Sequence, residues 1–202
     1  MAEISKTSVE IEDLFRLIVC TILGLDTETT NERIRFPWGS HLPAAVGSAP
    51  YWNREEDILF IYALPHDDPY NRPRDRHYVD RGDAGLVQLE EHTDVHEVLF
   101  VNYGPNAYET ARNIRNGLYR NDIRVLMQRN HFSLVTDVPA PRRVPELMDG
   151  AWWNRVDLSA VFNELVRKEY EAGTLESIRF DVSFTNRVGD VNGGADELHE
   201  TE

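Results

Sequence analysis

The sequence predicts an α+β fold: a mixed or antiparallel β-sheet with a long C-terminal hairpin, packed by two main α-helices. Three observations support this. A helical stripe of apolar residues begins at Ile11, a strand-like run over 95–103 leads into an amphipathic helix, and two segments near the C-terminus alternate around a glycine turn. A strand that leads at once into an amphipathic helix is typical of a sheet with helices packed on it.

The first helix has clear signals at both ends. Thr7 and Glu10 have the spacing of a capping box, and Gly24 is a plausible stop. Between them runs an apolar stripe with helical spacing: Ile11, Leu14, Phe15, Ile18, Ile22 and Leu25. Cys20 lies in this run, where we expect a small buried hydrophobe. Because it is the only cysteine, an intramolecular disulfide is impossible.

Residues 26–50 are predicted to form a loop or extended arm, because turn-forming residues and prolines interrupt every periodic pattern there. Loops of this length are usually functional or disordered. The arm contains Phe36 and Trp38, which favour docking on a surface. That surface is either a neighbouring subunit or the chain's own domain.

The middle of the chain reads as strands and helices in turn. Residues 57–64 are an almost wholly apolar strand ended by Pro65, residues 65–85 are polar and irregular, and residues 86–90 and 95–103 are further strands. A helix follows with one apolar stripe: Ala107, Ala111, Ile114 and Leu118. Asp122 is a candidate cap for a short helix, and residues 132–135 form a short strand before an extended proline-rich connection over 138–145.

The C-terminal part carries the hairpin signal. Apolar residues alternate strictly over 156–162 and again over 178–184, with a turn signal at 171–174. From Thr185 onward the chain is rich in Gly, Asp and Glu without periodicity. We therefore expect a single domain over residues 1–184, with an extended arm or loop at 26–50, and a flexible acidic tail over residues 185–202.

The charge balance limits the partners. Lys and Arg total 21 against 35 acidic residues, a formal net charge of −14 in 202 residues. Gripping nucleic acid needs a basic surface, so this balance argues against a phosphate-binding protein, although nucleic acid could still pass nearby. The N-terminus lacks a signal-peptide pattern, and the longest apolar run, 17–25, is too short to span a bilayer.

One group of residues invites a metal hypothesis. His66, Asp67, Asp68 and His77 are ligand types, but their spacing matches no helical or hairpin ligand pattern, and nearby arginines compete for the carboxylates. The alternative is a loop held by Arg–Asp pairs. Gly-x-Ser-x-Gly, P-loop and CxxC patterns are all missing from the sequence. We therefore expect no catalytic, metal or cofactor-binding residues, and a metal-dependent hydrolase stays as the less favoured alternative.

Five segments in order resemble a known family. They are Tyr51-Trp52-x4-Asp57-Ile58-Leu59-Phe60, Asp67-Asp68-Pro69-Tyr70-Asn71-Arg72, Val101-Asn102-Tyr103-Gly104-Pro105-Asn106-Ala107, Val144-Pro145-Glu146-Leu147 and Trp152-Trp153-Asn154-Arg155-Val156-Asp157-Leu158. Their order and spacing are similar to those of the tailed-bacteriophage neck terminator family, the head–tail joining or tail terminator proteins. The similarity covers residues 13–184, outside the acidic tail, and the 26–50 arm diverges from it.

The resemblance implies a non-enzymatic virion protein of the phage neck, assembled in the host cytoplasm. Six copies would form a ring that terminates the tail tube and joins it to the head-side connector. Its partners would be copies of itself, the tail tube, a sheath protein as an additional candidate, and the connector. DNA would pass through an acidic lumen without specific binding. Another virion ring component, such as a tail completion, connector or baseplate protein, is the main alternative.

Two groups of residues are candidates for subunit contacts. Aromatic residues in exposed segments favour docking, and arginines could pair with acidic patches on a neighbouring ring. The competing prediction is that the arginine-rich segment only braces its own subunit. The candidate residues are Asp67, Asp68, Asn71, Arg72, Arg74, Arg76, Trp38, Trp152 and Trp153.

Overall fold

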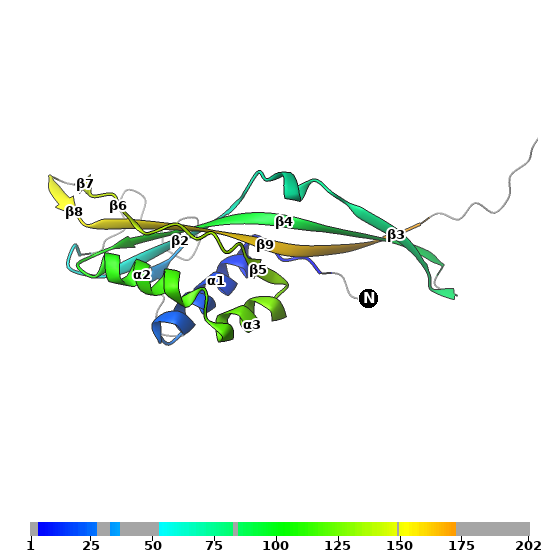
Figure 1. Ribbon diagram of the computed structural model, residues 1–202, viewed down its shortest axis with the longest axis horizontal. Coiled ribbons are helices and arrows are strands. Elements are labelled where there is room, and N and C mark those ends of the chain that lie inside the picture. The colour runs from blue at the N-terminus through cyan, green and yellow to red at the C-terminus, as the bar shows by residue number, and fades with distance from the viewer. Residues whose placement is uncertain (1–3, 28–32, 37–52, 83–84, 149, 173–202) are drawn as a thin grey trace, which may run out of the picture. The chain divides into compact units, whose positions relative to one another are not determined.

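Two long antiparallel strands run through the whole structure (Figure 1). The computed structural model describes residues 4–27, 33–36, 53–82, 85–148 and 150–172, all within one unit, Met1–Ala172. Its elements in chain order are α1 (Ser8–Leu23), β1 (Ile34–Arg35), β2 (Ile58–Pro65), the 3-10 helix η2 (Pro69–Asn71), β3 (Asp75–Asp80), β4 (Leu86–Tyr103), α2 (Ala107–Gly117), α3 (Asn121–Arg129), β5 (Phe132–Leu134), β6 (Arg142–Arg143), β7 (Glu146–Met148), β8 (Ala151–Trp153) and β9 (Arg155–Glu171).

The main sheet has the order β1-β2-β4-β9-β5. One edge of β4 pairs with β2 and then with β3, and its other edge pairs with β9 along almost its full length. β5 and β6 pair with the far edge of β9, while β1 runs parallel to β2. The predicted α+β class with a mixed sheet is therefore confirmed.

The strand β4 corrects one prediction. We expected separate strands at 86–90 and 95–103, but a single strand of 18 residues covers both. The polar residues between them suggested a break. Pairing with β9 satisfies the backbone there, and the Arg167 guanidinium on β9 forms an ion pair with Glu91. A polar stretch can thus continue a strand when a neighbouring strand supplies its partners.

The segment 65–85 was also predicted incorrectly as irregular throughout. It contains η2 and β3, and β3 pairs with residues 86–91 of β4. β3 is almost wholly exposed and pairs through one edge only, so its sequence needs no apolar alternation. Between β2 and β3, residues 66–74 leave the sheet on the side away from the three helices (Figure 1); we call this stretch the 66–74 loop.

The predicted C-terminal hairpin is described only in its first half. The alternating run 156–162 is a strand, as predicted, but the strand continues through Glu171, and its long partner is β4. Most of the expected turn at 171–174 and all of the run 178–184 lie outside the described residues. The same holds for the acidic tail 185–202 and for the 26–50 arm, apart from residues 26–27 and 33–36.

The three helices lie on one side of the sheet (Figure 1). The predicted capping box of α1 is present: Glu10 N–H donates to Thr7 Oγ1 over 3.3 Å, and Thr7 N–H donates to Glu10 Oε2 over 2.7 Å. Gly24 ends the helix in the left-handed conformation, as predicted. α3 exists, but Asp122 is not its cap. It lies in the first turn, and its carboxylate pairs instead with Arg120, the residue at the N-cap position. No helix in the described part of the chain is long and apolar enough to cross a membrane.

The hydrophobic core fills the space between the helices and the sheet. Phe15 of α1 lies at its centre, with ring centroids 5.8 Å from Phe132 and 4.7 Å from Phe162. All three rings are buried, and aromatic pairs at these separations stabilise beyond the area that they bury. A second, smaller cluster of Ile58, Phe60, Val101 and Tyr103 lies apart from the main core.

The contact between α1 and α2 depends on a glycine. A Cβ placed on Gly117 would lie 2.3 Å from Ile22 Cγ2, so the helices can approach this closely only because position 117 has no side chain.

We expect Gly117→Ala to lower the free energy of unfolding by about 1–3 kcal/mol, because the methyl group forces the helices apart and this strain outweighs the gain in helix propensity. Urea denaturation measures the change. Asn116→Ala, on the exposed side of the same turn, should have little effect. The double variant Gly117→Ala/Ile22→Ala should cost less than the sum of the two single variants, and simple additivity would contradict the proposed clash.

Candidate interaction surface

A short hairpin of β7 and β8 lies at one end of the sheet (Figure 1). Leu147 faces Trp152 across the hairpin, and Glu146 faces Trp153. Because side chains alternate along a strand, these two pairs point to opposite faces. Leu147 is 57% exposed and Trp152 is 66% exposed, whereas Trp153 packs against the cluster around Phe60 and Tyr103. The hairpin therefore has one docked face and one apolar face open to solvent.

The docked face is held to the sheet by aromatic and polar contacts. The hydroxyl of Tyr103, at the end of β4, donates to Glu146 Oε2 over 2.7 Å. The Tyr103 ring meets the Trp153 ring at 6.5 Å and the Phe60 ring at 5.9 Å, both edge to face. These contacts fix the orientation of the hairpin relative to β4.

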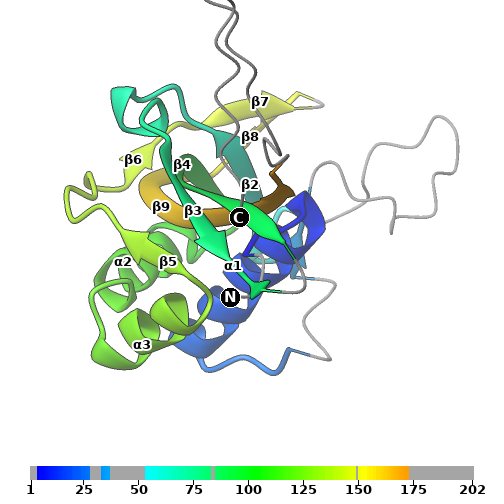
Figure 2. The same ribbon diagram turned by 90° about the vertical axis from the view of Figure 1, so that its right-hand side faces the viewer.

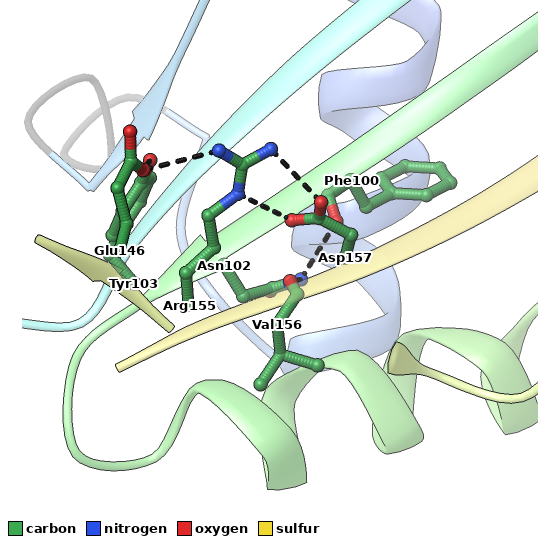
Figure 3. A network of polar contacts seen from close by, with 7 residues as sticks. All are labelled: Phe100, Asn102, Tyr103, Glu146, Arg155, Val156 and Asp157. Carbon is green, nitrogen blue, oxygen red and sulfur yellow. Dashed lines mark hydrogen bonds and ion pairs between the residues drawn. The ribbon is translucent and has the colours of Figure 1, made fainter. Parts of the chain in front are cut away.

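Arg155, the first residue of β9, connects the hairpin to the sheet (Figure 3). Its guanidinium binds both carboxylate oxygens of Asp157 at 2.8 and 2.9 Å, and its third nitrogen donates to Glu146 Oε2 over 3.1 Å. The same guanidinium lies 5.9 Å from the centre of the Tyr103 ring. Since Arg155 and Asp157 are two residues apart on a strand, they share a face and form the fork without strain.

The charges in this network stabilise one another. The hydrogen bond from Tyr103, and then the contact with Arg155, lower the pKa of Glu146 below its ordinary value. Burial and the bond to Glu146 raise the pKa of Tyr103, so the hydroxyl stays neutral and donates. The bond to Asp157 raises the pKa of Arg155. At neutral pH the neutral Tyr103 hydroxyl thus donates to Glu146, and the Arg155 guanidinium binds the carboxylates of both Glu146 and Asp157.

A buried amide continues the network into the sheet. Asn102 is 1% exposed, and its Nδ2 donates to the carbonyl of Phe100 over 3.0 Å and to that of Val156 over 3.2 Å (Figure 3). It therefore ties β4 to β9 directly beside Tyr103 and Arg155. The network holds the β7–β8 hairpin in place. The groups that it brings together pair with one another as hydrogen-bond donors and acceptors, and they do not place an exposed nucleophile beside a base.

The predicted aromatic candidates have different positions. Trp152 is exposed on the open face of the hairpin, as a contact residue would be, while Trp153 packs inward and positions the hairpin. Trp38 lies outside the described residues. Tyr103, Glu146, Leu147, Arg155 and Asp157 were not singled out as site residues. The i, i+2 spacing of Arg155 and Asp157 in a strand was the available signal, but pairing with Glu146 depends on the hairpin register.

The 66–74 loop is braced mainly by local hydrogen bonds. Asp68 accepts from Tyr70 N–H over 2.8 Å and begins η2, and Asn71 Nδ2 donates to the carbonyl of His66 over 2.6 Å. Arg72 lies 4.0 Å from Asp67, a pair whose side chains are 72% and 95% exposed. Such an exposed pair contributes little to stability, so Asp67 and Arg72 are available for other contacts.

Two of the predicted arginines are engaged within the chain. Arg76 Nε lies 2.8 Å from Glu90 Oε2, and Arg74 Nε lies 3.8 Å from Glu90 Oε1. The hydrogen bond from Arg76 lowers the pKa of Glu90. Of the predicted Arg–Asp pairs in this loop, only Arg72 with Asp67 is present, because the partner of Arg74 and Arg76 is Glu90 on β4. This geometry favours bracing of the subunit by these two arginines.

The candidate metal ligands do not come together. His77 is opposite Leu89 on β4, while the His66 N–H donates to the carbonyl of Val95, six residues further along. At about 3.3 Å per residue the two positions are roughly 20 Å apart. Across the ranges that the structure describes, no group of three His, Cys, Asp or Glu residues could hold a metal ion.

The pKa of Glu146 generates a prediction about pH. Because its folded-state pKa is below the ordinary value, ionised Glu146 stabilises the docked hairpin above the ordinary pKa, and this contribution is lost as pH falls through the folded-state value. We expect the near-ultraviolet circular dichroism of the tryptophans to lose intensity as the pH falls below the ordinary carboxyl pKa of 4.5. Glu146→Gln should weaken the signal at pH 6 and flatten its pH dependence. A profile identical to that of the wild type would argue against this role for Glu146.

Comparison with known proteins agrees with the resemblance seen in the sequence motifs. A family model described as phage neck terminator protein matches residues 60–189, which is more than half of the chain. The match includes the elements from η2 through β9 and most of β2, but not α1 or β1. No curated protein matches the chain. The matched range also contains every described member of the Tyr103–Glu146–Arg155–Asp157 network. The chain belongs to the phage neck terminator protein family.

Proposed function

We propose that this structural component of a phage neck closes with copies of itself into a ring, with six copies as the family resemblance implies. The ring terminates the tail tube and joins it to the head-side connector. Cyclic rings are built from heterologous contacts, in which one patch of a subunit meets a different patch of the next. The subunit therefore needs a protruding surface that is held rigidly and can be buried by a neighbour.

The observation that carries the proposal is the Leu147–Trp152 pair. The two side chains lie opposite each other on a hairpin whose other face is fixed by Tyr103 and Arg155. Tryptophan in a rigid, exposed position is typical of residues that dominate binding energy at interfaces, because little conformational entropy is lost when it is buried. We propose that this pair is covered by the neighbouring copy in the ring.

Charge supports the proposed path for DNA. The chain carries a net charge of −14, so several copies around a passage create a strong negative potential. Carboxylates and phosphates repel, so acidic groups facing the lumen would let DNA move without sticking. In this role the protein acts through its shape and charge, and its proposed function requires no covalent chemistry.

We expect Leu147→Ala/Trp152→Ala to weaken ring formation at least about 30-fold, because about 2 kcal/mol or more is typical for a central interface tryptophan. Sedimentation velocity over a concentration series measures the association, and negative-stain imaging of the largest species shows the number of copies. Val9→Ala is the matched control, because Val9 is similarly exposed, at 57%, but lies on α1.

Three results would contradict parts of this proposal. Unchanged association of the double variant would exclude the hairpin as the subunit contact. Images without rotational symmetry would exclude the ring itself. Labelling of purified virions at the baseplate rather than the neck would favour a different virion ring component.

A further inference from the structure

One segment of this acidic chain is basic. Residues 107–145, which contain α2, α3, β5 and β6, have seven arginines and three acidic residues, a formal charge of +4 in a chain of −14. The described residues outside this segment have twenty acidic and twelve basic residues. The net charge of this segment is therefore positive, whereas the net charge of the other described residues taken together is negative.

The fold gathers this segment on one side of the unit. Figure 2 shows α2, α3, β5 and β6 together along one edge, the edge where β5 and β6 pair with β9. Arg115 donates to the carbonyls of Val138 and Pro139, which ties the connection before β6 to α2. The Arg143 guanidinium lies 4.7 Å above the ring of Tyr108 on α2.

Six of the arginines are exposed. Arg142 is opposite Asp157 on β9 and points to the sheet face away from the helices, because Arg143, the next residue, lies over Tyr108 on α2. We call the other five the arginine face: Arg112, Arg120, Arg124, Arg129 and Arg143. Two of them have a carboxylate of their own, because Arg112 lies 3.0 Å from Glu109 and Arg120 lies 2.5 Å from Asp122. Among the described residues no carboxylate lies within ion-pair distance of the other three, Arg124, Arg129 and Arg143. Arg124, for example, donates to the neutral amide oxygen of Asn121 over 3.0 Å.

A surface of opposite sign lies across the sheet. Residues 53–68, which contain β2 and its flanks, have five acidic residues and one arginine, a formal charge of −4. We call this stretch the acidic edge. Its exposed carboxylates are those of Glu55, Glu56 and Asp67. In the strand order β1-β2-β4-β9-β5, the outermost strand beside β2 is β1, which carries Arg35. β2 and β5 lie on opposite sides of β9, so the two charged stretches are on opposite sides of that strand.

We propose that the arginine face binds the acidic edge of a second copy of this chain. The inference rests on the proposed ring and identifies the charged part of its repeating contact. Two arginine faces repel each other, and two acidic edges do likewise, so pairing of unlike patches is favoured over a symmetric dimer. Patches of opposite charge on opposite sides of β9 give the head-to-tail contact that a cyclic ring requires.

Guanidinium groups suit this role because each presents a planar fork that binds a carboxylate through two hydrogen bonds. The phosphates of DNA offer similar geometry and are the main alternative ligand. Three arginines that have no carboxylate partner among the described residues, on a chain of −14, are fewer than the roughly six to ten phosphate contacts that give strongly salt-dependent DNA binding. Burying the arginine face between subunits also removes its positive charge from the surface that faces the lumen.

A charge-swap experiment tests the contact. Variant A carries Arg124→Glu, Arg129→Glu and Arg143→Glu, and variant B carries Glu55→Arg, Glu56→Arg and Asp67→Arg. Each variant alone brings like charges together at every contact, so we expect its association, measured by sedimentation velocity, to fall at least tenfold relative to the wild type. In an equal mixture, each reversed face of A meets a reversed edge of B, and each native face of B meets a native edge of A. We expect the mixture to recover association in alternating order, which an even-numbered ring can close.

The readouts separate this inference from the proposed ring. Raising NaCl from about 50 mM to about 500 mM should weaken the wild type and the mixture alike. If the wild type forms rings and variant A does so equally well, or if the mixture does not recover, the inference is wrong and the ring stands. If the wild type stays monomeric at every concentration and salt level, both proposals are contradicted. Arginine-dependent binding of the wild type to a double-stranded DNA fragment, lost in variant A, would assign the face to DNA and overturn the inference.

Discussion

The antiparallel pairing of β4 with β9 is the constraint on which the rest of the structure depends. It runs from Val87 opposite Glu171 to Tyr103 opposite Arg155, so one register fixes both ends of the sheet. A shift of one residue would turn every side chain of β9 to the wrong face. The core under the helices, the anchor of the hairpin and the outer strands β3 and β5 all take their positions from this register.

Alternation along β9 divides its residues between two tasks. Val156, Leu158, Ala160 and Phe162 are buried in the core that the helices cover. Arg155 and Asp157 have the opposite parity and hold the hairpin through Tyr103 and Glu146. One strand therefore connects the stable interior to the presented surface. The hairpin is fixed by hydrogen bonds and ring contacts rather than by a deep core, and Glu146 accepts two of these hydrogen bonds, from Tyr103 and Arg155.

The net charge of the chain limits how its copies can associate. A chain of −14 does not associate with itself through average electrostatics, because copies repel. The proposed association would therefore depend on apolar contact area, for which Leu147 and Trp152 are exposed, and on local pairs of opposite sign. The family identifies the protein as a structural component of a phage neck. The proposed contact would bury arginines against carboxylates and so leave the exposed surface of the ring net negative.

The sequence by itself determined the α+β class, the caps of α1, the apolar stripe of α2 and the family, because periodicity, capping and local motifs depend on neighbours within a few residues. It offered both Trp152 and Trp153 as contact candidates, but did not indicate which of the two would pack inward. Only the tertiary structure decided that residues 86–103 form a single strand, that Glu90 pairs with Arg76, and that Arg155 joins Glu146 to Asp157. Those contacts join segments brought together by strand register and hairpin pairing, and register is set by the sum of many weak contacts across the sheet rather than by any local signal.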